Sequence, residues 1–167
     1  RAAAHAGAVS LREHRGRTKM HGGAVQVASL LVAGGDGVTW VVTAGEPISV
    51  TIGYEVRAGA AEQDVSFAFT ISNIHNHRLA CCRSHDTFLD PIRVKGSGMV
   101  TCHIPRLPLV PGVYKLSIGC TTEAGYSDGV YDAGTFEVVG TKFYASGTVP
   151  HSSHGPMLLD HSWRVNE

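Results

Sequence analysis

A strict alternation of apolar and polar side chains in the middle of the chain is the feature that most limits its fold. In ISVTIGYEV, Ile48 to Val56, almost every second residue is apolar, and the pattern returns in DVSFAFTIS, Asp64 to Ser72, and in VYKLSIGC, Val113 to Cys120. A period of two places successive side chains on opposite faces of a strand. We therefore predict strands with one buried face, and we expect the first two apolar faces to meet between two sheets.

Short β-branched and aromatic runs, separated by glycine, asparagine, aspartate and proline, continue on both sides of this centre. Such a texture is typical of an all-β sandwich. The Pro111-Gly112 pair predicts a turn directly before one of the strands. We expect about eight strands in two packed sheets: Ala24 to Val32, Thr39 to Thr43, Ile48 to Arg57, Asp64 to Ser72, Arg78 to Ser84, Gly98 to Ile104, Gly112 to Thr122 and Gly134 to Val139.

The two ends of the chain differ from this centre. Residues 1–20 are rich in alanine and charge without an apolar stripe, and the chain begins with Arg1, so we expect a linker or frayed helix that follows an upstream domain. Residues 21–167 are then the sandwich domain. Its last segment, 145–167, carries Met157, Leu158, Leu159 and Trp163, whose exposure would cost roughly 1.5–3 kcal/mol for each side chain. We expect this segment to add a strand to its own sheet or to that of a second copy.

The charge balance favours a neutral partner. The 14 basic and 14 acidic residues cancel, which leaves no field to gather nucleic acid or an anionic membrane. No apolar run approaches the roughly 20 residues that span a bilayer, so we expect a cytosolic domain. The four cysteines suit that compartment, since Cys81 and Cys82 are adjacent and resist bridging each other, while Cys102 and Cys120 have the phase of core residues.

Two stretches resemble metal sites in composition but not in spacing. The segment YSDGVYDAG, Tyr126 to Gly134, lacks the ligand ladder of a calcium loop, and a turn explains it as well. No phosphate-binding loop, nucleophile elbow or pair of carboxylates is recognisable, so we expect no cofactor, no metal and no catalytic residue. The second stretch that resembles a metal site runs from His75 to Asp86 and matches no common zinc pattern. It is better explained as a solvated hairpin tip followed by the returning strand. Its candidate ligands are His75, His77, Cys81, Cys82, His85 and Asp86.

The faces opposite the predicted core carry small, mostly hydroxylated side chains, where a routine solvent face would carry lysine, glutamate and arginine. Small hydroxylated residues leave room for a ligand and offer hydrogen bonds to a polyhydroxy compound. The β-propensity of serine and threonine explains the pattern equally well. Together with three residues at the rim, these faces give our candidate carbohydrate-binding set: Ser49, Thr51, Glu55, Ser66, Thr70, Lys115, Ser117 and Thr121 on the strands, and Arg83, His85 and Tyr126 at the rim.

The order of motifs resembles a known family. The matching pieces are Ala24 to Val32, TAGEPISVTIGYEV, DVSFAFTIS, GSGMVTCHIPRLPLVPGVYKLSIGC, AGTFEVVG and a closing strand that ends in Trp163. The most specific is I-P-x-L-P-L-x-P-G-x-Y-x-L. Over residues 23–165 the chain is similar to the C-terminal carbohydrate-binding domain of the ATP-binding subunit of O-antigen polysaccharide ABC transporters, the Wzt type. The His75 to Arg78 tip and the Cys81-Cys82 pair depart from that family.

The resemblance implies an immunoglobulin-like antiparallel β-sandwich, commonly a homodimer with exchanged C-terminal strands. It implies a non-catalytic module that binds the non-reducing end of a lipid-linked O-antigen polysaccharide and couples it to export. The implied partners are the ATPase domain of the same chain and the membrane subunit of the transporter, so the module would act in the cytoplasm at the inner membrane. A structural homodimerisation module without glycan binding is the alternative, and a metal-dependent or hydrolytic enzyme has the least support.

Overall fold

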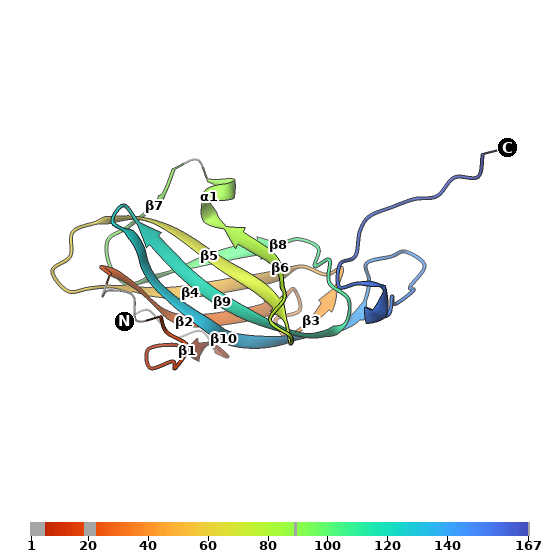
Figure 1. The fold of residues 1–167 in the computed structure, drawn as a ribbon, viewed down its shortest axis with the longest axis horizontal. Coiled ribbons are helices and arrows are strands. Elements are labelled where there is room, and N and C mark those ends of the chain that lie inside the picture. The colour runs from red at the N-terminus through yellow and green to blue at the C-terminus, as the bar shows by residue number, and fades with distance from the viewer. Residues whose placement is uncertain (1–5, 19–22, 89, 167) are drawn as a thin grey trace.

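Two β-sheets packed face to face make up the chain, as the sequence predicts (Figure 1). The computed structural model describes residues 6–18, 23–88 and 90–166. One sheet has the order β1-β2-β4-β8 and is called the four-stranded sheet; the other has the order β3-β10-β9-β5-β6 with β7 beside β5 and is called the six-stranded sheet. All neighbours are antiparallel except β3 and β10.

Each of the eight predicted strands is present. Their bounds are β2 Val25–Gly34, β3 Val41–Ala44, β4 Ile48–Val56, β5 Gln63–Asn73, β6 Arg78–Arg83, β8 Gly98–Ile104, β9 Gly112–Thr122 and β10 Gly125–Thr141. Three short elements are additional: the strands β1 Val9–Ser10 and β7 Ile92–Val94, and the helix α1 Ser84–Thr87. A 3-10 helix, Ser152–His154, lies in the C-terminal segment. No helix in the parts of the chain that the structure describes is long and apolar enough to cross a membrane.

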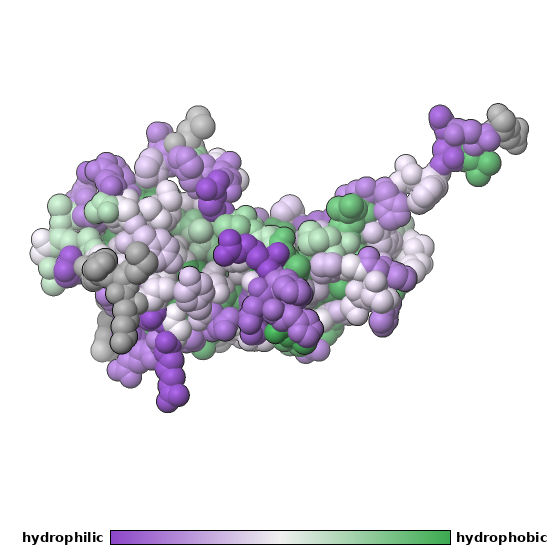
Figure 2. All heavy atoms as spheres, in the orientation of Figure 1, coloured by the Kyte–Doolittle hydropathy of each residue, from purple (hydrophilic) through white to green (hydrophobic). Residues whose placement is uncertain are grey.

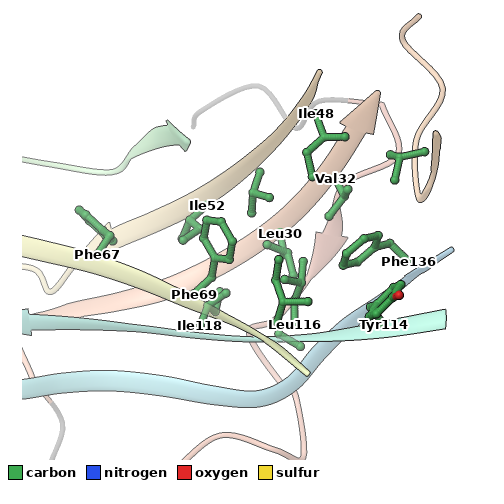
Figure 3. Packing of buried hydrophobic residues seen from close by; sticks show 14 of the residues in the cluster. Leu30, Val32, Ile48, Ile52, Phe67, Phe69, Tyr114, Leu116, Ile118 and Phe136 are labelled. Carbon is green, nitrogen blue, oxygen red and sulfur yellow. The ribbon is translucent and has the colours of Figure 1, made fainter. Parts of the chain in front are cut away.

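The core lies between the sheets and consists of the alternating residues that the sequence predicts (Figure 3). Ile52 of β4 and Phe69 of β5 are at most 3% exposed, whereas Tyr54 and Val56, at the end of the same face of β4, are partly buried and pack against the core. Tyr114 of β9 is buried with them, and its hydroxyl donates a hydrogen bond to the carbonyl oxygen of Val110 at 2.6 Å. The Tyr114 side chain therefore extends back to the turn that precedes its strand and provides a hydrogen-bond donor for a buried backbone carbonyl there.

The N-terminal segment differs from the expectation of a linker or frayed helix. Residues 9–10 pair with β2, Leu11 is fully buried, and residues 16–18 bond to β10. The guanidinium of Arg17 forms an ion pair with the carboxylate of Asp128 on β10 and donates to the carbonyl oxygens of Leu11 and Val27 at 2.7 and 3.0 Å. One leucine and one arginine hold this segment. Because neither creates a periodic pattern, the contact was not predicted.

Strand β10 is longer than predicted. Residues 125–133 were expected to be a loop or turn, yet they pair with β9 across a tight hairpin in which Gly125 lies opposite Thr122. The register shifts between Tyr126 and Asp128 and again between Val130 and Gly134. The first shift adds one residue to β10 and the second adds two, so the alternation is interrupted and no continuous period of two remains in the sequence.

The C-terminal segment docks only in part. Leu158 is buried, as is Phe143 just before the segment, and the Leu158 backbone nitrogen donates to the carbonyl oxygen of Pro108 at 2.7 Å. Gly45, whose φ is +81°, lies against the backbone just before this segment, so closely that a Cβ would come within 2.5 Å of the Phe143 nitrogen.

Over residues 159–166, the part of this end that the structure describes, the predicted closing strand is not formed within the single chain. The side chains of Leu159 and Trp163 are 67% and 92% exposed, although we expected both to be buried. Figures 1 and 2 show this end as a narrow projection that leaves the body of the molecule.

Candidate functional site

The outer face of the six-stranded sheet carries an open pocket of about 840 Å³. It lies over β5, β9 and β10, which run side by side in Figure 1. The register explains its floor, because Thr70 lies opposite Ser117 and Ala68 lies opposite Gly119. Small side chains on neighbouring strands thus leave the sheet open to a ligand. The lining residues are Thr18, Ala68, Thr70, Ser72, Asn76, Arg78, Ser117, Ile118, Gly119, Thr121, Tyr126, Val130, Tyr131 and Asp132.

Tyr126 lies on a pair of glycines within this floor. Gly119 and Gly129 are register partners on β9 and β10. A Cβ at Gly119 would lie 2.8 Å from the Tyr126 hydroxyl oxygen, and one at Gly129 would overlap the phenol ring. The hydroxyl end of the ring can therefore lie over the sheet only because both positions lack a side chain. The Tyr126 side chain remains 45% exposed, which leaves an aromatic surface open to the pocket.

The phenol of Tyr126 keeps its proton at neutral pH. Burial, with smaller contributions from Tyr131, Cys120 and Asp128, raises the pKa of Tyr126 above its ordinary value. Its hydroxyl can thus both donate and accept a hydrogen bond. Tyr131, which is 62% exposed, adds a second aromatic side chain to the same pocket.

Polar groups at the rim largely satisfy one another. The Lys115 ammonium donates to Asn76 Oδ1 at 3.0 Å and lies 3.9 Å from a carboxylate oxygen of Asp132. The Asp132 backbone nitrogen donates to the Ser117 hydroxyl oxygen at 3.1 Å, so the proton of that hydroxyl is free for another acceptor. Arg78 also lines the pocket, so the rim carries two basic side chains, Lys115 and Arg78, and one acidic side chain, Asp132, together with a free hydroxyl proton on Ser117. This chemistry suits a polyhydroxy ligand.

The N-terminal segment supports the pocket from one side. Thr18 lines it, and the Thr18 backbone nitrogen donates to the carbonyl oxygen of Gly129 at 2.9 Å. Beneath the floor, the carboxylate of Asp128 accepts from the Val27 backbone nitrogen at 2.8 Å and pairs with Arg17. The strand that carries Tyr126 is thus fixed to the opposite sheet next to the position of the tyrosine.

The structure divides the predicted carbohydrate-binding residues between two faces. Thr70, Ser117, Thr121 and Tyr126 line the pocket, while Ser66 and Lys115 lie on the same sheet outside its lining. Ser49, Thr51 and Glu55 belong to β4, in the four-stranded sheet on the other side of the core. Thr51 there shares a hydrogen bond of 2.9 Å with Thr101, and Glu55 pairs with Arg12.

The other two rim candidates lie outside the pocket. Arg83 forms an ion pair with Asp86 at 2.6 Å, and His85 is on α1. Sequence reasoning missed Tyr131 and Asp132 because it assigned their segment to a loop. It missed Thr18 because that segment lacks a pattern. The remaining signal was the pair of tyrosines near Gly129, Tyr126 and Tyr131, because aromatic side chains with a polar end are common in binding sites.

The stretches that resemble metal sites have other roles. Within residues 6–18, 23–88 and 90–166, no group of three or more histidine, cysteine, aspartate or glutamate side chains is arranged to hold a metal ion. The rings of His75 and His77 lie 6.2 Å apart on the hairpin tip. Cys81 and Cys82 point to opposite faces of β6. Asp128 is occupied by its ion pair with Arg17.

Comparisons with known proteins agree with this architecture. The family model described as the Wzt C-terminal domain matches residues 15–151. Among solved structures, the C-terminal domain of Wzt superimposes with a TM-score of 0.67 at 15% identity, over 90% of this chain and 87% of that chain. At such identity the likeness shows the fold alone. A search of curated proteins found no match.

Two further solved structures are more distant. A protein named as a β-galactosidase from Bacteroides fragilis has a TM-score of 0.47 at 13% identity, over 64% of this chain and 17% of that chain. The alkylpurine DNA glycosylase AlkC from Pseudomonas fluorescens has a TM-score of 0.44 at 15% identity, over 70% of this chain and 30% of that chain. Both TM-scores are too low to indicate a common fold.

Proposed function

Because the chain belongs to the Wzt C-terminal domain family, we propose that it is a non-catalytic carbohydrate-binding module that recognises the non-reducing end of a lipid-linked O-antigen polysaccharide. The observation that carries this proposal is the pocket on the six-stranded sheet, with its glycine floor, exposed tyrosines and hydroxyl groups. Binding there would license export of the finished glycan by an ABC transporter. The partners would be an ATPase domain of the same protein and the membrane subunit, at the cytoplasmic side of the inner membrane.

The proposed binding mode follows from the chemistry of the pocket. The exposed faces of Tyr126 and Tyr131 can pack against the apolar C–H faces of sugar rings. The hydroxyls of Thr70, Ser117 and Thr121 offer donors and acceptors at the floor. A pocket open to solvent admits the end of a long polymer whose remaining units stay outside. Aromatic packing combined with a few placed polar groups is the usual composition of a small-molecule site.

The test compares the two outer faces with the same substitution. Thr70→Trp fills the pocket, whereas Thr51→Trp places the same side chain on the four-stranded sheet. The probe is the O-chain polysaccharide of the source organism, with and without its non-reducing terminal modification, measured by calorimetry. We expect at least a tenfold loss of affinity for Thr70→Trp and less than a twofold change for Thr51→Trp. The reverse ranking would move the site to the four-stranded sheet, and no binding by the unsubstituted chain would contradict the proposal.

Homodimerisation without glycan binding is a second candidate function. It is favoured by the projecting C-terminal segment, where Leu159, Trp163 and Val165 are 67%, 92% and 91% exposed. Exposed apolar side chains of this size are typical of a surface that a partner covers. We propose that a second copy covers them, by strand exchange between the two chains. The same arrangement is compatible with glycan binding, so the two candidates differ in whether the pocket is used.

Light scattering after size exclusion tests this candidate independently of any glycan. We expect the full chain to be a dimer and a chain ending at Leu158 to be a monomer with an unchanged far-UV spectrum. Trp163→Ala is the milder variant and should weaken the dimer at least tenfold. A full chain that stays monomeric at about 100 μM would overturn the dimer proposal, because a specific interface that buries these side chains should be much tighter.

A further inference from the structure

Two thiols face each other across one edge of the sandwich. Strand β6 is the last strand of the six-stranded sheet, and β8 is the last strand of the four-stranded sheet. Cys82 on β6 is the register partner of Phe69, and Cys102 on β8 is the register partner of Val50. Phe69 and Val50 are both core residues. Register partners point to the same face of a sheet, so both thiols point into the space between the sheets.

The surroundings of the two thiols support this placement. Both side chains are half-buried and pack against the hydrophobic core. Burial, followed by the effect of Cys102, raises the pKa of Cys82 to about 11, and burial also raises the pKa of Cys102, which Cys82 lowers by a smaller amount. The two sheets contact each other through β2 on one side and β9 and β10 on the other, so β8 and β6 close the same edge of the sandwich; the effect of each thiol on the pKa of the other agrees with neighbouring positions there.

The other two cysteines have different positions. Cys81 is the register partner of Thr70 and is exposed on the outer face of β6. Cys120 is buried, and its sulfur lies 3.7 Å from the carbonyl oxygen of Val25. These residues serve as internal controls for the behaviour of an exposed thiol and of a deeply buried one.

We propose that Cys82 and Cys102 are a site of reversible oxidation, at which a low-molecular-weight disulfide such as oxidised glutathione converts the two thiols into an inter-sheet disulfide. One thiolate attacks the oxidant and forms a mixed disulfide, which releases the first glutathione thiolate. The second thiolate then displaces the other glutathione. The protein loses two protons and two electrons, and one oxidised glutathione becomes two reduced molecules.

The disulfide would join two strands that the fold otherwise leaves as free edges. The β5–β6 hairpin, whose residues Asn76 and Arg78 line the pocket, would then be bonded to the four-stranded sheet. The bond would close a loop of about 20 residues, which restricts the unfolded chain and stabilises the folded one. Oxidation would therefore stiffen one side of the pocket without adding a group to it.

The experiment uses Cys81→Ser so that the exposed thiol does not react first. This variant is incubated with oxidised glutathione at pH 8.5, where the thiolate fraction is larger than at pH 7, then quenched, alkylated and digested with trypsin. We expect an intact mass about 2 Da below that of the reduced chain. We also expect one cross-linked peptide pair, formed by residues 79–83 and 96–106. The melting temperature Tm should rise by roughly 5–10 °C.

Two further variants decide the assignment. Adding Cys82→Ala or Cys102→Ala to the Cys81→Ser background should abolish the mass change, the cross-linked peptides and the rise in Tm. Cys120 should stay free throughout, as the buried control. Glutathione adducts without the cross-link, covalent dimers alone, or a cross-link that survives either alanine substitution would each overturn the proposal. Failure of this test would not affect the glycan experiment, which does not involve these thiols.

Discussion

The ion pair between Arg17 and Asp128 gives the most direct test of how the N-terminal segment is held. The Arg17 side chain is 22% exposed and that of Asp128 is 5% exposed. Arg17→Ala removes the ion pair and two hydrogen bonds to backbone carbonyls, and it leaves a buried carboxylate whose remaining donor is the Val27 backbone nitrogen. Breaking a buried pair from one side costs about 3–5 kcal/mol. Since solvent reaches the guanidinium, we expect about 3 kcal/mol.

Chemical and thermal unfolding measure this loss. For a domain of this size, about 3 kcal/mol lowers Tm by roughly 6–12 °C. The matched control is Arg12→Ala in the same segment, because Arg12 is 64% exposed and pairs with the exposed Glu55. Exposed pairs contribute about 0–1 kcal/mol, so the control should unfold almost like the parent chain.

A double-mutant cycle isolates the interaction energy between Arg17 and Asp128 from the contributions of their other contacts. Asp128→Asn keeps an acceptor for Val27 but removes the charge. The double variant, Arg17→Ala with Asp128→Asn, should lose about 1.5–3 kcal/mol less free energy of unfolding than the two single variants lose together. Equal and small effects of Arg17→Ala and Arg12→Ala would refute the reasoning, since they would mean that residues 6–18 do not depend on this ion pair.

Three further predictions concern single sites. Tyr114→Phe should lower the free energy of unfolding by about 1–2 kcal/mol in urea titrations, because the carbonyl of Val110 loses its buried donor; no change would contradict that hydrogen bond. Gly45→Ala should cost about 2–4 kcal/mol, since its φ of +81° is combined with contact against the backbone, whereas Gly37→Ala, with φ of +82° and open space, should cost about 1–2 kcal/mol; equal losses would rule out the contact. Burial first, and then the neighbouring carboxylate of Asp128, raise the pKa of the Cys120 thiol from 9.0 to about 12. The folded state therefore holds its proton more tightly than the unfolded state, so stability should fall as pH rises from about 9 towards about 12. A Cys120→Ala variant should show a smaller fall, and an identical pH profile would exclude this thiol as the cause.

The alternation of Ile48 to Val56 and of Asp64 to Ser72 was sufficient to predict both sheets. In these strands, burial on one face alone selects the residue type. Strand β10 was recognised only from Gly134, because its two register shifts interrupt the same pattern. The N-terminal segment was missed for a different reason: a single buried leucine and one ion pair have no period.

The candidate site was predicted only in part. Hydroxylated faces on β4 and β5 look alike in the sequence, although they lie on opposite sides of the core. The position of the pocket depends on what surrounds each face, including Tyr131 on β10 and Thr18 on the N-terminal segment. Such neighbours are brought together by register and by bulges. These are properties of pairs of strands, so the pattern within one strand cannot reveal them.

The glycine floor beneath Tyr126 implies a rule of joint substitution. Glycine in a strand costs roughly 0.5–1 kcal/mol relative to a residue with a side chain, so Gly119 and Gly129 are unfavourable unless something uses the space above them. The Tyr126 ring uses it. Relatives that keep an aromatic residue at position 126 should therefore keep both glycines, and relatives that lose it should acquire β-branched residues there. The three positions would then change together as one inherited unit.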